Sequence, residues 1–366
     1  MTDAAMKNAS EAISNNNIGF TATVSEFEYE LASFGLSSPV CVSSGSAGLV
    51  VALKALKIGK GDEVVLPRQT FIATGLAVLE VGATPVFCDI NLNSGMLDLD
   101  SVARLINGKT RAIIYVHWGG ISEDTRKLRD LAFRNNIGFI EDAAHAFGSK
   151  SLDGTRLGNV ESDNHFIVFS FQAIKFFSTG DGGCICSSPK HFSDLKALSW
   201  FGVQRDSKQK RRSANREFGL NVTLPGYKHN MNAIQASIGL GNLKNIHDRI
   251  RLRRNRAKVI YHSIIESKFL TSMLACESQL DVGVFWFFPM LCKHRSEFIE
   301  YLNKCDVPSS TIDYRIDVNP IFTDYPTDDG IMQRSFDEQF LALPLGDHIP
   351  CIEIRRFGQV CKEFRP

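Results

Sequence analysis

Short apolar runs rich in β-branched residues alternate with longer helical patterns through the first half of the chain. Such runs are typical of buried strands, whereas apolar residues at helical spacing indicate covering helices. Strand, helix and strand in succession predict a mostly parallel sheet with helices on both faces. The predicted strands cover residues 40–43, 63–66, 84–88, 111–117, 138–141, 166–170 and 183–187, and the predicted helices cover residues 47–56, 70–81, 99–106, 122–135 and 191–201.

A polar segment with several basic residues, at 203–230, ends this alternation, and a long helical pattern follows at 231–267. We expect an α/β protein with a large domain over residues 1–240, including an N-terminal helix, and a smaller C-terminal α+β domain over residues 241–366 that begins with a connector helix. In the smaller domain the pattern predicts a strand at 284–290 and helices at 295–304 and 352–364.

The composition is that of an ordinary globular protein, with 44% hydrophobic and 22% charged residues. The 41 basic and 40 acidic side chains leave a formal charge of +1, so no overall field favours nucleic acid or an anionic membrane. Apolar stretches such as 284–291 are far shorter than the roughly 20 residues that span a bilayer, and residues 1–10 lack the apolar core of a signal peptide. We therefore expect a cytoplasmic protein that binds neither nucleic acid nor membrane.

The nine cysteines are scattered, and several lie in apolar runs, which predicts reduced, buried thiols. Cys184 and Cys186 form the one close pair, and no second pair stands at metal-ligand spacing. We expect no metal site and interpret the pair as two inward-facing residues of one strand.

The corner after the first predicted strand carries small residues, Ser43-Ser44-Gly45-Ser46-Ala47-Gly48, and opens directly into an apolar helix. Ligands of parallel sheets bind beyond the carboxyl ends of the strands. Small residues there let the backbone close on an anion, which the N–H groups and the helix dipole attract. The segment therefore suggests a phosphate site, although by itself it is also typical of an ordinary serine N-cap.

A second corner, Ile140-Glu141-Asp142-Ala143-Ala144-His145, ends an apolar strand with carboxylates and a histidine. A buried carboxylate needs a cationic or hydrogen-bonding partner. The protonated nitrogen of a pyridine ring fits this need, because a carboxylate keeps that ring charged and able to withdraw electrons. The alternatives are that Asp142 caps the following helix and that His145 is a packed core histidine.

A third segment, at 169–183, places one lysine, Lys175, among aromatic and apolar residues just beyond a strand. Such surroundings favour the neutral amine, which is the nucleophilic form and can form a Schiff base. The alternative of a solvated surface lysine is opposed by the neighbours Phe171, Ile174, Phe176 and Phe177. The glycines that follow, at 180–183, provide the tight turn of a loop around the lysine.

Several blocks in one order carry a resemblance to a known family: SSGSAGL, LPRQTFIAT, GATPVFCDI, YVHWGG, EDAAHAFG, SFQAIKFFSTGDGG and PGYKHNMNAIQASIGL. Together they resemble the DegT/StrS-type sugar aminotransferases over residues 25–345. These are enzymes of the aspartate-aminotransferase fold, fold type I, that use pyridoxal 5′-phosphate to aminate nucleotide-linked keto-sugars. An ordered set of blocks is more specific than any one of them.

The resemblance implies roles for four residues around the cofactor ring. Lys175 matches the lysine that forms the Schiff base with the cofactor and moves the proton, and Asp142 matches the partner of the pyridine nitrogen. Phe71 stands where the family stacks an aromatic side chain on the ring, and His145 stands where a His or Gln lies beside it.

The resemblance also implies how the cofactor phosphate is held. Ser46 and Ala47 stand where the family has a Thr-Ala or Ser-Ala pair on the phosphate, and Ser170 resembles a second phosphate ligand. Asn230 matches an asparagine that reaches the phosphate of the neighbouring subunit, which implies a homodimer with shared active sites.

The substrate side is less well defined by the sequence. Gln172 and Ser46 replace a commoner His and Thr of the family. The basic run at 208–216 suits a nucleotide diphosphate but equally a solvated loop, and the arginines between 249 and 256 are interpreted as the polar face of the connector helix. Arg315, Lys228 and His229 are the candidates for substrate binding.

We predict that the protein transfers an amino group from L-glutamate to a nucleotide-linked keto-sugar. A 4-keto-6-deoxyhexose is favoured, because GYKHNM resembles the GYKYN form of enzymes that aminate carbon 4. The product would serve amino sugar and polysaccharide biosynthesis. The alternatives are amination of another keto- or aldehyde-sugar, at carbon 3 or on an eight-carbon acid sugar, and a non-catalytic regulator that binds pyridoxal phosphate. Family dehydratases carry a histidine in place of the lysine, so Lys175 favours transamination.

Overall fold

The structure is a computed structural model, and the residues that it describes are 1–121, 123–204, 222–312 and 315–366. The basic run at 208–216 therefore lies outside the described residues.

The predicted strands form one seven-stranded sheet in the order β1-β7-β6-β5-β4-β2-β3. Strands β2 to β6 run parallel to their neighbours, whereas β7 is antiparallel to both β6 and β1. The prediction of a mostly parallel sheet is confirmed. The strands are β1 (Val40–Val42), β2 (Glu63–Pro67), β3 (Thr84–Cys88), β4 (Thr110–Val116), β5 (Gly138–Asp142), β6 (His165–Ser170) and β7 (Gly183–Cys186).

Helices cover both faces of this sheet, and its strands are therefore buried on both sides. Val64 and Leu66 of β2 pack in a cluster with residues of the helices after β1 and β2, while Val65 between them packs in a second cluster on the opposite face. The large-domain helices after β1 are α3 (Gly45–Ala55), α4 (Ile72–Glu80), α5 (Leu99–Leu105), α6 (Arg126–Arg134) and α7 (Phe192–Leu198).

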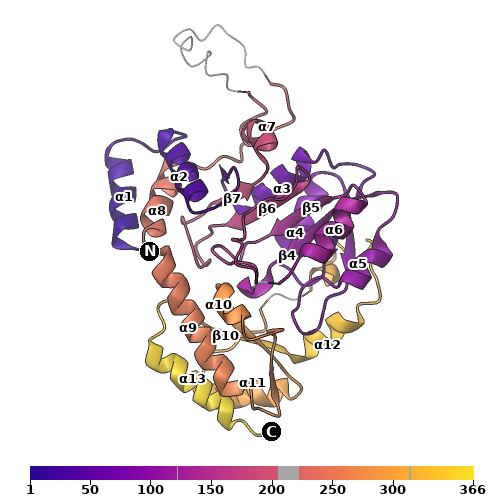
Figure 1. Cartoon of the computed structure of the whole chain (residues 1–366), viewed down its shortest axis with the longest axis vertical. Helices are drawn as coiled ribbons and strands as arrows, with labels where there is room; N and C mark the ends of the chain where they lie inside the picture. The colour runs from indigo at the N-terminus through magenta and orange to yellow at the C-terminus, as the bar shows by residue number, and fades with distance from the viewer. Residues whose placement is uncertain (122, 205–221, 313–314) are drawn as a thin grey trace.

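The long helical pattern at 231–267 is two helices, so the prediction of one long helix is wrong. Helix α8 (Ala233–Leu243) ends at Lys244, and α9 (Ile246–Ile264) begins after Asn245. The two helices pack on different partners: α8 on α1 (Asp3–Ser14) and α2 (Ala22–Ser33), and α9 on α13 (Cys351–Glu363). Figure 1 shows α1, α2 and α8 side by side and α9 leading away from them. The boundary at residue 240 stays a prediction.

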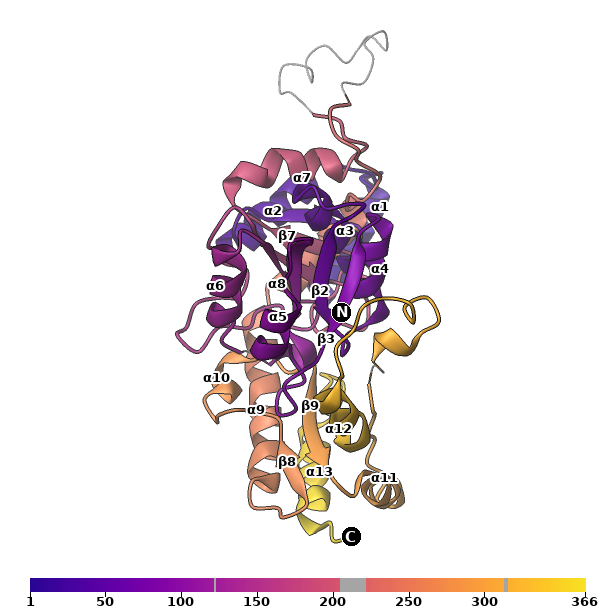
Figure 2. The ribbon, with the colours of Figure 1, turned by 90° about the vertical axis from the view of Figure 1, so that its right-hand side faces the viewer.

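The C-terminal part contains a three-stranded antiparallel sheet in the order β10-β9-β8. The predicted strand at 284–290 is shifted to 287–292, because residues 284–286 pair instead with the loop at Gly119 and Gly120. In Figure 2 this layer lies beneath the large sheet. Its elements are β8 (Leu270–Ser272), α10 (Gln279–Val282), β9 (Phe287–Cys292), α11 (Arg295–Lys304), α12 (Ile331–Gln339), β10 (Phe340–Pro344) and α13.

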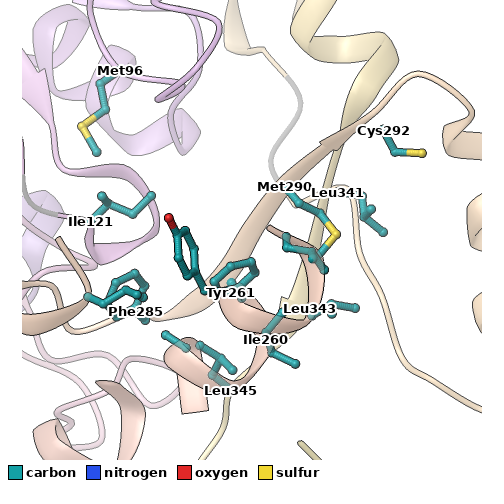
Figure 3. Packing of buried hydrophobic residues seen from close by; sticks show 14 of the residues in the cluster. Met96, Ile121, Ile260, Tyr261, Phe285, Met290, Cys292, Leu341, Leu343 and Leu345 are labelled. Atoms are coloured by element: carbon teal, nitrogen blue, oxygen red, sulfur yellow. The ribbon is translucent and has the colours of Figure 1, made fainter. Parts of the chain in front are cut away.

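One apolar cluster joins the two parts of the molecule. Met96 and Ile121 from the large part lie in it with Tyr261, Phe285 and other residues of the C-terminal part, and Figure 3 shows the Tyr261 ring directed toward them. Because burial of apolar surface contributes about 25 cal/mol per Å², this shared core holds the C-terminal layer against the large sheet.

The arginines of α9 differ from their predicted position. Arg253 and Arg256 are buried and donate to backbone carbonyl groups of Phe285 and Ile349, among others. The interpretation as a solvated polar face is wrong for these two, because they satisfy carbonyl groups of the C-terminal loops, while Arg251 remains exposed.

Candidate active site

A cavity of about 470 Å³ opens at the carboxyl ends of β5 and β6, beside the N-termini of α3 and α4. It brings together most of the residues predicted to surround the cofactor. Those that line it are Ser46, Phe71, Asp142, His145, Ser170 and Lys175.

The first turn of α3 forms one end of the cavity. Ser44 caps the helix by accepting the Ala47 N–H (3.1 Å), so the N-cap reading holds, while Gly45 and Ser46 line the cavity beside it. A Cβ on Gly45 would approach Ser170 Cβ to 2.8 Å, so glycine is needed for the helix to lie this close to β6. The N-terminus of α3, together with Ser46 and Ser170, is suited to bind an anion. Ala47 does not line the cavity, and its N–H is used in the cap.

Asp142, the last residue of β5, lies at the cavity's buried side. Its Oδ2 accepts a hydrogen bond from the Thr74 hydroxyl (2.9 Å) and its Oδ1 accepts one from the Ala144 N–H (3.1 Å). Burial raises the pKa of this carboxyl above its ordinary value, although the two hydrogen bonds and the nearby Lys175 charge oppose the shift. Both hydrogen bonds come from neutral donors, the Thr74 hydroxyl and the Ala144 N–H. The protonated nitrogen of a pyridine ring would be a cationic partner for this carboxylate.

His145 is buried, and its ring contacts the Gly119 N–H and the Trp286 ring. The Gly119 N–H donates to Nδ1 (3.2 Å), which leaves the ring proton on Nε2. Burial, and then the charge of Lys175, holds the pKa of this imidazole well below its ordinary value. His145 is therefore a neutral ring near pH 7 that can lie against another ring or donate from Nε2.

Lys175 follows β6 in a short turn, in which its N–H donates to the carbonyl of Gln172. Its amine lies 4.2 Å from the centre of the Trp286 ring, within range of a cation–π interaction. Gly182 closes the loop at φ +145°, where a Cβ would meet the Thr179 hydroxyl at 2.4 Å. This turn brings Lys175 to the wall of the cavity.

Phe71 lies at the mouth of the cavity on the residue before α4, with 58% of its surface exposed. A large exposed aromatic ring on a cavity is available to cover a flat ligand. Its predicted stacking role fits this position.

The structure leaves the other predicted residues outside the cavity. Asn230 lies in a separate pocket, with its carboxamide oxygen buried and without a hydrogen-bond partner in the described part of the chain. Lys228 and His229 precede it, His229 half-buried and Lys228 exposed. Arg315 donates to Asp317 (2.7 Å). Their predicted roles stay predictions.

Sequence reasoning missed two residues that shape the cavity. Thr74 on α4 fixes Asp142, and Trp286 enters from the C-terminal part to contact both His145 and Lys175. The spacing from Phe71 places Thr74 one turn into the helix, so it could have been found. Trp286 lies in an apolar run with no local signal.

Cys184 and Cys186 are both buried in β7, as predicted, and the structure places them in one cluster with Cys41. Within the described ranges, no group of three or more His, Cys, Asp or Glu side chains could hold a metal ion. The same residues include no helix long and apolar enough to cross a membrane.

The residues around the cavity fit pyridoxal phosphate. The buried carboxylate of Asp142 suits the ring nitrogen of that cofactor, and the Lys175 amine suits its carbonyl group. The flat side chains of Phe71 and His145 suit the faces of the ring, and the N-terminus of α3 with its serines suits the phosphate. The carboxylate carries the strongest part of this fit, because it is buried at the cavity and accepts its hydrogen bonds from two neutral donors, the Thr74 hydroxyl and the Ala144 N–H.

A model of the DegT/DnrJ/EryC1/StrS aminotransferase family matches residues 1–359, so the chain belongs to this family. Transaminases of the family use pyridoxal phosphate. The predictions of the family, of an aminotransferase and of this cofactor are confirmed at the level of the family.

The chain is similar to a curated relative and to solved structures. It is 35% identical over 236 residues to the spore coat polysaccharide biosynthesis protein SpsC of Bacillus subtilis, a match that spans 64% of this chain and 59% of the relative. The structure of AtS13 from Actinomadura melliaura has a TM-score of 0.90 at 26% identity, over 100% of this chain and 96% of that one. Sugar aminotransferase CalS13 from Micromonospora echinospora has a TM-score of 0.89 at 25% identity, over 99% and 97%.

Proposed function

From membership of this family, we propose that the chain is a pyridoxal-phosphate-dependent aminotransferase that moves an amino group from L-glutamate to a nucleotide-linked keto-sugar. The observation that carries the proposal is the meeting of Lys175 and Asp142 in one cavity. When bound, pyridoxal phosphate supplies a reactive carbonyl and a ring that withdraws electrons from the substrate carbon.

Each residue of the cavity has its own role in the proposed reaction. Asp142 keeps the proton on the ring nitrogen, since an ionised carboxylate stabilises a cation beside it. Lys175 binds the cofactor through its amine and then moves a proton at the substrate carbon. Ser46 and Ser170 orient the phosphate at the start of α3. Donor and acceptor react in turn at one site, so the kinetics are ping-pong.

The acceptor is proposed to be a nucleotide-linked 4-keto-6-deoxyhexose. The GYKHNM block supports carbon 4, and the name of the spore coat relative supports a product used in a polysaccharide. A panel of nucleotide-linked keto-sugars with the ketone at carbon 3 or carbon 4 tests this choice. Faster turnover of a 3-keto-sugar or of an eight-carbon acid sugar would replace the proposed substrate and keep the reaction.

The first test is the visible absorbance of the protein reconstituted with pyridoxal phosphate. We expect a Schiff-base band that L-glutamate removes, and no such band in Lys175→Ala. A wild-type protein without the band contradicts the proposal. A band that glutamate leaves unchanged, with every other amino donor also inactive, favours a non-catalytic protein that binds the cofactor.

The active unit is proposed to be a homodimer in which Asn230 of one copy completes the site of the other. The buried carboxamide oxygen of Asn230, which lacks a partner in the described residues, supports this role. Mixed dimers of Lys175→Ala with Asn230→Ala test it, because one of their two sites keeps both residues. Activity above that of either variant alone is expected, and its absence contradicts the shared site.

A further inference from the structure

Trp286 links the C-terminal part of the molecule to the cavity. It stands just before β9, where its backbone N–H donates to the carbonyl of Gly119 (2.9 Å). The N–H of the same Gly119 donates to His145 Nδ1 (3.2 Å). Gly119 adopts φ +71°, and a Cβ there would lie 3.1 Å from the Phe287 ring. The backbone of Trp286 and the ring of His145 are therefore held by one glycine.

The indole of Trp286 makes three contacts around the cavity. Its Nε1–H donates to the carbonyl of Ile174 (3.0 Å), the residue before the lysine. The Lys175 amine lies 4.2 Å from the ring centre. The ring also lies 4.1 Å from that of His145, at an interplanar angle of 32°. One side chain thus touches the backbone beside the lysine, the lysine amine and the neutral histidine.

Trp286 also separates two hollows. The cavity described above and a neighbouring groove of about 750 Å³ share Ile174, Lys175 and Trp286 in their walls. The groove is otherwise lined largely by C-terminal residues, such as Ser309 and His348. Lys175 and Trp286 therefore stand together at the border of the two hollows.

We propose that Trp286 is a positioning residue that holds the Lys175 amine toward the cavity. The face of the indole attracts the amine when it is charged, and the indole N–H fixes the backbone that carries it. Tryptophan alone among side chains combines a large aromatic face with an N–H donor, so phenylalanine can replace only part of this function. This inference rests on the proposed function for its kinetic consequence but not for its geometry.

Two variants separate the contributions of the ring. Trp286→Phe keeps an aromatic face and loses the hydrogen bond to Ile174, whereas Trp286→Leu loses both. Phe288→Leu is the matched control, because Phe288 is a buried aromatic residue of β9 that packs in the core and not at the cavity. Far-UV circular dichroism establishes that each variant is folded.

The first readout uses the protein without cofactor. The reaction of Lys175 with an amine-specific acylating reagent is followed by peptide mass spectrometry at pH 7.5. We expect roughly threefold to tenfold faster labelling in Trp286→Leu, because the amine loses its aromatic neighbour, a smaller increase in Trp286→Phe, and none in Phe288→Leu. Wild-type labelling rates in both Trp286 variants overturn the proposal, and if Trp286→Leu does not fold, Trp286→Phe decides.

The second readout uses the protein with its cofactor. Misplacement of a reacting group lowers turnover more than binding, so Trp286→Leu is expected to lower kcat at least about tenfold with little change in the KM for L-glutamate. An equal loss in Phe288→Leu contradicts a positioning role. If the wild type shows no transamination, the proposed function fails, and the labelling rates still decide the position of the amine.

Discussion

Glu141 and Asp142 are neighbours at the end of β5, but their carboxylates have different hydrogen-bond partners and pKa shifts of opposite sign. Glu141 accepts from Nε2 of His117 and of His165, each at 2.6 Å. Burial raises the pKa of Glu141, but the hydrogen bonds and charges of the two histidines outweigh it and hold the pKa far below its ordinary value. Asp142 has only a hydroxyl and an N–H, and its pKa is raised.

The difference follows from the pleat of the strand. Successive side chains point to opposite faces of a sheet, so Glu141 lies on one face among its histidines and Asp142 faces the cavity on the other. A buried anion whose charge is compensated within the protein stabilises the fold. A buried anion left without a cation costs stability and is ready for a ligand that brings one.

The largest effect is expected when Asp142 loses its charge. Asp142→Asn keeps the shape of the side chain but cannot stabilise a proton on the ring nitrogen. We expect kcat to fall by roughly 100- to 1,000-fold, about 3–4 kcal/mol, as measured in the glutamate half-reaction. Without cofactor, the variant is expected to be as stable as the wild type or up to about 1 kcal/mol more stable, since a strained charge is gone.

Glu141→Gln is expected to show the reverse pattern. Replacing the carboxylate weakens two buried hydrogen bonds, to Nε2 of His117 and of His165, so the free energy of unfolding should fall by about 3 kcal/mol, measured by urea denaturation at pH 7. The kcat should stay within about threefold of wild type, because Glu141 does not face the cavity. If Glu141→Gln lost turnover but not stability, Glu141 would act in the reaction and not in stabilising the fold.

Glu161→Gln is the control for this variant. Glu161 pairs with Arg129 at 2.6 Å, but 49% of its side chain is exposed. Its removal should cost less than about 1 kcal/mol.

The stability contributions of Glu141 and Asp142 should change in opposite directions as the pH falls, because their pKa shifts have opposite signs. The lowered pKa of Glu141 contributes stability that is complete above the unfolded value of about 4.3 and is lost as the pH falls toward the folded pKa. The raised pKa of Asp142 contributes stability below the unfolded value of about 3.9, lost as the pH rises through the folded pKa.

The stability difference between wild type and Glu141→Gln should therefore narrow by about 1.4 kcal/mol per pH unit below about pH 4. Urea titrations at pH 7, 4 and 3 measure it. For Asp142→Asn the opposite is expected: as the pH falls, the free energy of unfolding of the wild type should rise relative to that of the variant. Differences that do not vary with pH would show that the two carboxylates do not differ as described.

The smallest effect is expected at Thr74, which supports Asp142 through one hydrogen bond. Thr74→Val keeps the volume and removes the hydroxyl, at a cost of about 1 kcal/mol or fivefold in kcat. Thr74→Ser should restore most of the loss because it keeps the donor. Equal kcat values in all three proteins would show that the hydroxyl does not orient the carboxylate.

Much of the fold could be predicted because its signals are local. The seven strands of the large sheet and the helices between them follow from apolar runs and helical spacing, within a few residues of their observed bounds. The split of 231–267 into two helices could not be predicted, because the periodicity continues through Lys244 and Asn245. It is packing on different partners that ends one helix and starts the next.

The candidate site divides in the same way. Ser46, Asp142 and Lys175 each follow or begin an element in a recognisable segment, and the chain brings them together because the carboxyl ends of parallel strands meet at one edge. Their shared cavity was therefore foreseeable. The burial of Arg253 and Arg256 was not, since a helical arginine pattern does not tell whether carbonyl groups of a distant loop lie within reach.

The sequence by itself determined the order of strands and helices, the small residues at the start of α3, and the lysine and carboxylate of the site. Only the tertiary structure decided that Glu141 meets two histidines while Asp142 faces the cavity, and that Trp286 lies against Lys175. The physical reason is that these contacts join residues more than 20 positions apart in the chain. Periodicity describes which face of an element is apolar, but the position of distant elements decides what each buried charge meets.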